Sequence, residues 1–271
     1  MKSHMITGGK GVQLHLVETG NSSGRPILFI HGFSQCSLAW TRQLNSELAD
    51  NFRLVAMDMR GHGLSEKPCD GYADSRLWAD DVRAAIETLD LDHPILCGWS
   101  YGPLVILDYL RHYGEDNIRG LNFVGGVTKL GSDEAASVLT ADFLNLIPGF
   151  FSSDVEDSVR SLGSLLSLCF ANELSSEDRY RMLGCSVSVP PYVRRGLFSR
   201  AFDNDDLLQK LRKPVLITHG TADAVVKTTV IDQQMARIVP AQVRMMATGH
   251  ACFWDDAAGY NRYLREFAEA L

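Results

Sequence analysis

Four short apolar runs constrain the fold of this chain more than any other feature of its sequence. They are PILFI at 26–30, LVAM at 54–57, PILC at 94–97 and PVLI at 214–217, and each is followed within two residues by Gly, Asp or His. Uninterrupted runs of this length are typical of strands that are buried on both faces of a parallel sheet. The segment 11–17 alternates between apolar and polar residues, which predicts a half-buried strand, and 242–246 is a sixth candidate strand.

Segments with a helical period separate these runs. In 75–89, apolar side chains recur on one side of a helix at Leu77, Val82, Ala85, Ile86 and Leu89. The segments 103–112 and 255–271 are also predicted to be helical. Strands that alternate with helices in this way predict an α/β fold with a doubly wound, mostly parallel sheet.

The alternation stops between residues 128 and 212. This stretch has no strand-like run, but it has helix-start signals at Ser153-Asp-Val-Glu156, Ser175-Ser-Glu-Asp178 and Pro190-Pro191. We therefore predict a sheet domain of residues 5–127 and 213–271, with a helical cap inserted at 128–212. Residues 1–4 are left out of this prediction because Ser3-His4-Met5 resembles a cloning remnant.

Composition predicts a folded protein and argues against two classes of partner. The 271 residues are 45% hydrophobic and 22% charged, and a net charge of −7 argues against nucleic acid or an anionic membrane as the main partner. No apolar run approaches the ~20 residues of a membrane-spanning helix, and no apolar stretch follows Lys2, so we expect no signal peptide and a cytoplasmic location. The six cysteines lack metal-ligand spacing, so we expect reduced thiols and no metal. Nothing in the sequence indicates the oligomeric state.

The sequence Gly98-Trp-Ser-Tyr-Gly102 is the strongest chemical signal in the chain. It lies where an apolar run ends and a predicted helix begins, and Pro103 suits the first turn of that helix. A serine at such a turn adopts a strained backbone that exposes its hydroxyl, and glycines two residues before and after it relieve the crowding. We therefore predict that Ser100 is a nucleophile. A tight turn with an idle hydroxyl is the alternative.

A serine hydroxyl needs a base near neutral pH, and the base needs a group that orients it. His250 follows the candidate strand 242–246, which places it at the same sheet edge as Ser100. Asp223 follows the run 214–217, and the order serine, aspartate, histidine along the chain is a known order for a catalytic triad. Ordinary loop roles are the alternatives for His250 and Asp223. The rival acids, in more helix-like or solvated runs, are Asp203, Asp205, Asp206 and Asp232.

Backbone N–H groups beside the serine are predicted to stabilise the negative charge that forms on the substrate oxygen. Tyr101 follows the nucleophile, and Phe33 lies in the loop after the first buried run, where Gly32 allows a close approach of the backbone. We expect the N–H groups of Phe33 and Tyr101 to form this oxyanion hole. His31, beside Gly32, is interpreted as a structural residue that braces the loop.

These motifs, together with Asp58-Met-Arg60-Gly-His62-Gly-Leu-Ser65, occur in the order seen in the α/β-hydrolase superfamily, which the chain resembles over nearly its whole length. Within it, the chain is similar to the branch of cofactor-free haloperoxidases (perhydrolases), small carboxylesterases and enol-lactone hydrolases. The resemblance implies that Asp58 and Arg60 hold a structural loop. Serine rather than aspartate at position 100 argues against haloalkane dehalogenases and epoxide hydrolases. Tyr101 and Phe33 replace the frequent methionine and tryptophan of perhydrolases, which favours plain esterase activity.

We therefore expect a serine hydrolase of carboxylic esters or lactones that uses neither metal nor cofactor and acts through an acyl-enzyme. The sequence contains no Gly-x-Gly-x-x-Gly and no His/carboxylate cluster with metal spacing. Two alternatives stay open. One is a related enzyme that uses peroxide as acceptor or cleaves a carbon–carbon bond. The other is a ligand receptor with slow or absent turnover, because fold and motif do not decide the biological role.

Candidate substrate-binding residues come from the neighbour of the nucleophile and from the predicted cap. The apolar run around Pro148-Gly149 is expected to bend over the strand ends and roof the site. The candidates are Trp99, Leu144, Leu146, Ile147 and Phe150; for the last four, packing within the cap is the alternative. No Lys or Arg occurs between residues 130 and 160, so we expect neutral, short-to-medium esters or lactones.

Overall fold

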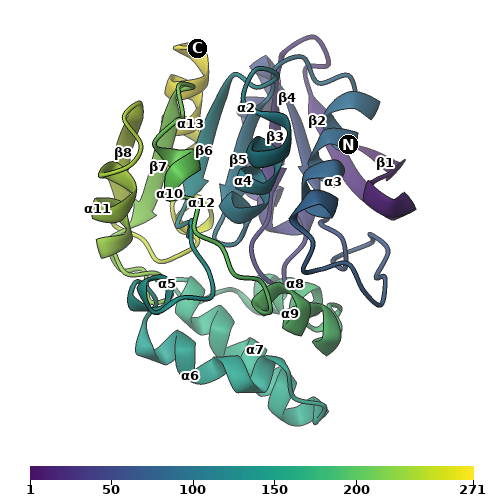
Figure 1. Cartoon of the computed structure of the whole chain (residues 1–271), viewed down its shortest axis with the longest axis vertical. Coiled ribbons are helices and arrows are strands. Elements are labelled where there is room, and N and C mark those ends of the chain that lie inside the picture. Colours follow the sequence, from purple (N-terminus) through teal and green to yellow (C-terminus); the bar gives the residue numbers. More distant parts are fainter.

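An eight-stranded sheet forms the centre of the computed structural model, which describes residues 1–271 (Figure 1). The strands are β1 (Lys2–Thr7), β2 (Gln13–Gly20), β3 (Arg25–Ile30), β4 (Phe52–Met57), β5 (Ile95–Trp99), β6 (Gly120–Val124), β7 (Val215–Gly220) and β8 (Ala241–Met246). Their order in the sheet is β1-β2-β4-β3-β5-β6-β7-β8. Strands β3 to β8 run parallel, whereas β1 and β2 pair antiparallel at one edge. The predicted α/β fold with a mostly parallel sheet is confirmed.

Helices cover both faces of this sheet. On one face, α3 (Ser75–Thr88) packs against α4 (Gly102–Tyr113); α1 (Thr41–Leu44), α12 (Cys252–Asp255) and α13 (Ala257–Glu269) pack together on the other (Figure 1). The remaining short helices of this part are η1 (Gly9–Gly11), η2 (Ser37–Trp40), α2 (Leu48–Asn51), α10 (Asp205–Leu208) and α11 (Thr229–Met235). The predicted helices at 75–89 and 103–112 are confirmed. The predicted helix at 255–271 is mostly α13, which Asp256 begins by accepting a hydrogen bond from the N–H of Gly259.

Five helices lie together beyond the carboxyl ends of the parallel strands, in the lower part of Figure 1. They are α5 (Asp133–Ser137), α6 (Ala141–Phe150), α7 (Val155–Cys169), α8 (Ser176–Val187) and α9 (Pro191–Phe198), and we call them the helical lobe. Ser175 caps α8 and Pro191 opens α9, as predicted. The cap of α7 is Asp154, whose side chain accepts from the N–H of Asp157, and not Ser153. None of the helices combines the length and apolar character needed to span a membrane.

Helix α6 corrects the prediction of a bend at Pro148. The helix runs from Ala141 through Pro148 to Phe150. A proline within a helix removes the one hydrogen bond that its N–H would give to the carbonyl four residues earlier, here that of Leu144. Because α6 ends two residues after Pro148, only its last turn bears this loss. The apolar side chains of α6 therefore follow a helical period and do not splay on a bend.

Strands β1 and β6 are not among the predicted strands. In β1, the Nε2 of His4 lies 2.7 Å from an oxygen of Glu18 on β2. Setting residues 1–4 aside is therefore wrong, because residues 2–4 belong to the sheet. In β6, Asn122 interrupts the apolar run that would signal a buried strand. Its amide donates to the carbonyl of Leu216 (3.0 Å) and accepts from the hydroxyl of Tyr260 (2.7 Å), so its polar atoms are paired inside the core.

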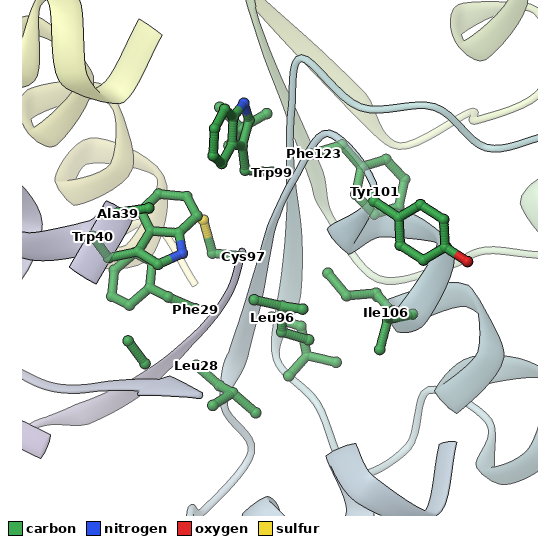
Figure 2. Packing of buried hydrophobic residues seen from close by; sticks show 14 of the residues in the cluster. Leu28, Phe29, Ala39, Trp40, Leu96, Cys97, Trp99, Tyr101, Ile106 and Phe123 are labelled. Atoms are coloured by element: carbon green, nitrogen blue, oxygen red, sulfur yellow. The ribbon is translucent and has the colours of Figure 1, made fainter. Parts of the chain in front are cut away.

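The strands that precede the candidate nucleophile are buried on both faces (Figure 2). Leu28 on β3 pairs with Leu96 on β5, and Phe29 pairs with Cys97, so alternate side chains point to opposite faces. Phe29 packs on Trp40 with ring centroids 4.9 Å apart. This two-sided burial explains the uninterrupted apolar runs in the sequence, and it holds the end of β5 rigidly in place.

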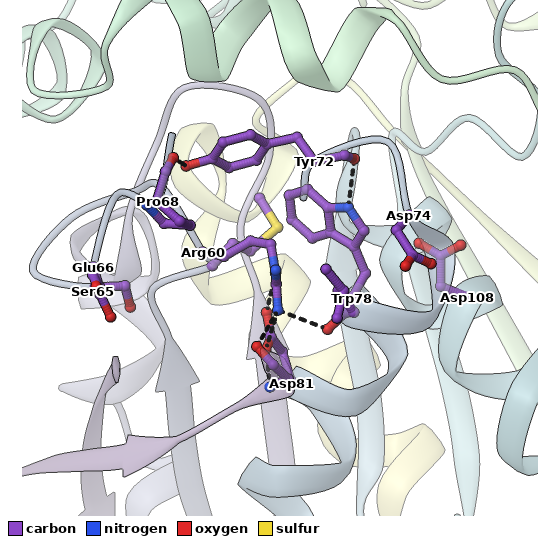
Figure 3. Close-up of polar contacts among 12 residues, drawn as sticks. Arg60, Ser65, Glu66, Pro68, Tyr72, Asp74, Trp78, Asp81 and Asp108 are labelled. Atoms are coloured by element: carbon purple, nitrogen blue, oxygen red, sulfur yellow. Dashed lines mark hydrogen bonds and ion pairs between the residues drawn. The ribbon is translucent and has the colours of Figure 1, made fainter. Parts of the chain in front are cut away.

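The loop after β4 is held by buried charged groups, as the resemblance implied. Arg60 donates from Nε and Nη2 to the two carboxylate oxygens of Asp81, at 2.7 Å each (Figure 3). Asp58 accepts from the backbone N–H groups of Ser37 (2.6 Å) and Leu64 (2.9 Å). These contacts join the loop to α3 and η2, and neither Asp58 nor Arg60 lines the pocket described below.

Two buried histidines beside this loop predict a loss of stability in mild acid. Burial lowers the pKa of His31 to about 4 and that of His62 to about 3, so both are neutral in the folded protein at higher pH. In the unfolded chain these histidines are protonated below pH ~6.5. Each proton that only the unfolded chain binds lowers the unfolding free energy by about 1.4 kcal/mol for every unit by which the pH decreases. Stability is therefore full above pH ~6.5 and falls as the pH drops toward the folded-state values.

Urea unfolding between pH 6.5 and 4.5 measures this effect through the variant His62→Asn. We expect the unfolding free energy of the variant to depend less steeply on pH than that of wild type, and the difference in slope should correspond to at most one bound proton. Asp108, whose pKa burial raises to about 6, contributes a slope of opposite sign that is common to both proteins. His93→Asn is the control, because that side chain is exposed and should leave the slope as it is. Equal slopes in wild type and His62→Asn would contradict the prediction.

Candidate active site

Ser100 lies in the turn between β5 and α4 with a backbone φ of 57°. This left-handed conformation is strained for a residue with a side chain, and here it is enforced by neighbours. A Cβ on Gly98 would come within 2.7 Å of the backbone of Gly102, so glycine is needed for the turn to close. The N–H of Ser100 donates to the carbonyl of Val124 (2.9 Å), and its carbonyl accepts from the N–H of Val127 (3.2 Å).

His250 and Asp223 form a buried pair. The Nδ1 of His250 lies 2.7 Å from Oδ2 of Asp223, and both side chains are almost fully buried. Burial alone would raise the pKa of Asp223, but the charge and hydrogen bond of His250 lower it below its ordinary value. Asp223 is therefore a carboxylate at neutral pH. Because a carboxylate only accepts hydrogen bonds, Nδ1 carries the proton and Nε2 of His250 is left as an acceptor.

The backbone around Asp223 fixes its orientation. Its Oδ1 accepts from the N–H groups of Val225 and Val226, each at 2.8 Å, which leaves Oδ2 facing His250. A second histidine, His219 at the end of β7, reaches the same oxygen with Nε2 at 3.3 Å. His219 is fully buried, and its Nε2 also lies 3.0 Å from the carbonyl of Val226. Nothing in the one-dimensional pattern of the sequence signals this contact.

Nε2 of His250 has no hydrogen-bond partner within the protein. It faces the same pocket as Ser100, since both residues line that pocket. Trp99 holds the histidine from the other side, where its indole N–H donates to the carbonyl of His250 at 3.1 Å. The structure thus brings Ser100, His250 and Asp223 together at one site, with the hydroxyl and the free imidazole nitrogen unbonded to each other. The rival acids Asp205 and Asp206 are instead paired with Lys129 and Arg111.

The two backbone N–H groups predicted to form an oxyanion hole are free. Neither Phe33 nor Tyr101 donates its N–H to an acceptor in the protein, and both residues line the pocket beside Ser100. A Cβ on Gly32 would lie 3.0 Å from Cβ of Ser100, so the loop approaches the serine more closely than other residues would allow. Free donors at this place can stabilise a negatively charged oxygen on a bound substrate.

His31 is placed as a bracing residue of this loop and not as part of the pocket. Its Nδ1 donates to the carbonyl of Gly32 at 2.8 Å, and its Nε2 accepts from the N–H of Met59 at 3.0 Å. Both nitrogens are used, which matches the neutral state that its lowered pKa gives.

The side chain of Tyr101 is buried, and its hydroxyl group has two hydrogen-bond partners. Its hydroxyl donates to the carbonyl of Leu197 on α9 (3.1 Å) and accepts from Arg200 (3.1 Å). Burial raises the pKa of Tyr101 to about 12, so the hydroxyl stays protonated. Tyr101 therefore lines the pocket, and its side chain also joins the start of α4 to the helical lobe.

An apolar pocket opens between Ser100 and the helical lobe. Fourteen of its eighteen lining residues are hydrophobic, so it suits an uncharged ligand. Besides the residues already described, its wall is made by Leu139, Phe143, Leu165, Leu166, Phe198 and Val226. Trp99, one of the predicted substrate-binding residues, is part of the lining.

The other four predicted substrate-binding residues do not line this pocket, and that part of the prediction is corrected. Phe150 is fully buried and packs on Phe33 with ring centroids 5.2 Å apart. Leu144, Leu146 and Ile147 are partly buried against the core. In the continuous helix α6, Leu146, Ile147 and Phe150 follow Phe143 by three, four and seven residues, so they share its side of the helix but lie farther along the axis. Only Phe143, in the first turn, reaches the pocket.

Two polar residues of the lining had no signal in the sequence. Gln35 lies two residues after Phe33, and its Nε2 donates to Oγ of Ser186 on α8 at 2.8 Å. Lys129 is held by Glu134 (2.8 Å) and Asp205 (2.9 Å), so its charge is matched within the protein and not left for a ligand. No group of three or more His, Cys, Asp or Glu residues is arranged to hold a metal ion.

The family model described as alpha/beta hydrolase fold matches residues 25–257. The chain belongs to this family. An esterase from Rhodococcus sp. ECU1013 has a similar structure, with a TM-score of 0.94, 34% identity and full coverage of both chains. A putative aryl esterase from Burkholderia cenocepacia gives a TM-score of 0.90 and 30% identity over 99% of this chain and 98% of that one. A bifunctional esterase/perhydrolase of Acinetobacter calcoaceticus is 28% identical over 86% of this chain and 87% of the relative. This α/β hydrolase is thus similar to esterases and to perhydrolases.

Proposed function

We propose that this α/β hydrolase cleaves carboxylic esters or lactones of small, mostly apolar molecules through Ser100, His250 and Asp223. The observation that carries the proposal is the arrangement of His250. Its Nδ1 is fixed by a buried carboxylate at 2.7 Å, while its Nε2 is free and shares a pocket with the strained Ser100. The similarity to esterases supports the choice of ester chemistry.

In this mechanism the hydroxyl of Ser100 rotates toward Nε2 of His250 when substrate binds. Nε2 takes the proton as the serine oxygen attacks the carbonyl carbon, and Asp223 stabilises the imidazolium that forms. The same nitrogen then gives its proton to the leaving alcohol, which leaves an acyl group on Ser100. Water, activated by His250, releases the acid and restores the enzyme.

The N–H groups of Phe33 and Tyr101 would hold the carbonyl oxygen while it bears negative charge. Each such donor contributes about 3 kcal/mol to stabilising the transition state. Neither N–H group has an acceptor within the protein, so no hydrogen bond must be broken when the charge develops. We further propose that residues 128–212 act as the cap of this site, since the helical lobe supplies much of the apolar wall.

The proposal is tested with a series of p-nitrophenyl esters of increasing acyl length and a panel of lactones. We expect turnover to favour neutral, short-to-medium substrates over long-chain lipids and charged acids, because the lining is apolar and its one lysine is already paired. Turnover that depended on an anionic acyl group would contradict this substrate class.

Hydrogen peroxide is the second candidate acceptor, which would make the enzyme a perhydrolase. The observation in its favour is the similarity to the bifunctional esterase/perhydrolase of Acinetobacter calcoaceticus. The same acyl-enzyme would then pass its acyl group to peroxide and give a peracid. Measuring acid and peracid formation in one mixture separates the two acceptors, and we expect water to dominate.

Acyl-length preference should depend on Phe143 and not on its helix neighbour Phe150. Phe143 lines the pocket, so Phe143→Ala should shift the kcat/KM ratio between short and medium acyl groups by the ~1–3 kcal/mol typical of an apolar pocket contact. Phe150→Ala is the matched control. It removes the same group from the core, so we expect a loss of about 3–5 kcal/mol in unfolding free energy and an acyl-length profile like that of wild type. A larger change of profile in Phe150→Ala than in Phe143→Ala would contradict this assignment.

A further inference from the structure

Two cysteines from different parts of the fold meet with their sulfur atoms 2.8 Å apart. Cys36 lies in the sheet domain, directly before η2, and Cys185 lies on α8 of the helical lobe. Both are free thiols in this structure and are almost fully buried. This separation is shorter than the usual contact between two unbonded sulfur atoms. A disulfide bond length of about 2.05 Å is therefore reached by a movement of less than one ångström.

The chain segments on both sides of the pair are already held together. The hydroxyl of Ser34 donates to the carbonyl of Ser186 at 3.0 Å, and Nε2 of Gln35 donates to Oγ of Ser186 at 2.8 Å. Residues next to each cysteine are therefore fixed against each other by hydrogen bonds. The contact between residues 34–36 and α8 therefore already holds the two sulfur atoms close together, and no rearrangement of the helical lobe is needed.

The pair also differs from the other cysteines in its chemistry. No other two cysteines contact each other through sulfur. A hydrogen bond from the thiol of Cys36 lowers the pKa of Cys185, because it stabilises the thiolate, and the same bond raises the pKa of Cys36. Burial instead raises the pKa of Cys97 to about 12, which keeps that thiol protonated and unreactive.

We propose that Cys36 and Cys185 form a redox modification site, at which a small peroxide oxidises the two thiols to a disulfide that ties α8 to the sheet domain. A small oxidant is required because both sulfurs are buried. The thiolate of Cys185 attacks one peroxide oxygen, the O–O bond breaks, and a sulfenic acid forms on Cys185 with release of hydroxide, which takes up the proton that the Cys185 thiol had lost and leaves as water. The sulfur of Cys36 then attacks the sulfenic sulfur and expels hydroxide, which takes the proton of Cys36 and leaves as water. Two thiols are oxidised by two electrons, and one peroxide is reduced.

The disulfide would link residues that are 149 positions apart in the chain. A cross-link over a loop of this length strongly restricts the unfolded chain, so it should raise the midpoint of thermal unfolding, by about 10 °C for a chain of this size. It should also slow the opening of α8 away from the sheet domain, which hydrogen exchange at the amides of α8 reports.

The test treats the full-length reduced protein with a small excess of hydrogen peroxide. We expect the intact mass to fall by two hydrogen atoms, and peptide mapping without reductant to join the peptides that contain Cys36 and Cys185. The rise in thermal midpoint should disappear on adding dithiothreitol. Cys36→Ala should instead gain oxygen at Cys185, because the sulfenic acid no longer has a thiol to react with. Cys185→Ala should show neither change.

Cys69→Ala is the matched control, because it removes the exposed cysteine and leaves the buried pair intact. This variant should form the Cys36–Cys185 bond as wild type does. The proposal is overturned if wild type keeps both thiols after peroxide treatment, if the bond maps to another pair, or if the cross-linked protein unfolds at the same temperature as the reduced one. The mass and mapping readouts do not require either cysteine variant to fold.

Discussion

Replacing Ser100 with alanine should abolish ester turnover and leave thermal stability nearly unchanged. Loss of a serine nucleophile lowers kcat by a factor on the order of 10⁶. The hydroxyl of Ser100 makes no hydrogen bond within the protein, so its removal costs no folded-state contact, and alanine meets the same strained φ of 57°. The measurement is hydrolysis of p-nitrophenyl acetate beside a thermal unfolding curve of each protein.

A fluorophosphonate probe gives the same assignment by a different route. It should label wild type at Ser100 and fail to label Ser100→Ala. Ser34 is a matched control, since it is a second serine near the site with positive φ, but its hydroxyl is already bonded to the carbonyl of Ser186. Ser34→Ala should keep the label on Ser100 while it loses stability. A label mapped to any other serine would show that the nucleophile is assigned wrongly.

The parts of the site that lie at the ends of buried strands could be predicted from the sequence. Strands β5 and β7 are apolar runs because both of their faces are covered. The ends of these strands can therefore be recognised in the sequence. Ser100 and Asp223 follow those ends directly. Parallel strands bring their carboxyl ends to one edge, and this rule alone placed His250 at the same site.

Other parts of the fold could not be predicted because their stability depends on distant contacts. Strand β6 contains Asn122, whose partners Leu216 and Tyr260 are far away in sequence, so the strand lacks the uninterrupted apolar run by which the other buried strands are predicted. In the helical lobe, the sequence indicates where some helices begin but not how the helices are oriented. Whether Phe143 or Phe150 faces the pocket depends on how α6 packs on α7 and α9, which the pattern of a single helix does not contain.

Substitution of Asp223 by asparagine should remove most of the activity, and the reason lies in hydrogen-bond directions. Oδ1 of Asp223 accepts from the N–H groups of Val225 and Val226, so an asparagine would keep its carbonyl oxygen there. Its NH₂ group would then face Nδ1 of His250, which must become an acceptor. The proton moves to Nε2, and His250 can no longer accept the proton of Ser100.

We therefore expect kcat to fall about 10⁴-fold in Asp223→Asn, and by a factor on the order of 10⁶ in His250→Ala, where the base itself is gone. Asp206→Asn is the matched control, because that carboxylate is exposed and pairs with Arg111 away from the pocket. It should keep near-wild-type kcat on p-nitrophenyl acetate. If Asp223→Asn retained most of the activity while Asp206→Asn lost it, the supporting acid would be wrongly assigned. A large loss of kcat only in Asp223→Asn, with an unfolding curve close to that of wild type, would show that the loss comes from the changed tautomer of His250 and not from unfolding.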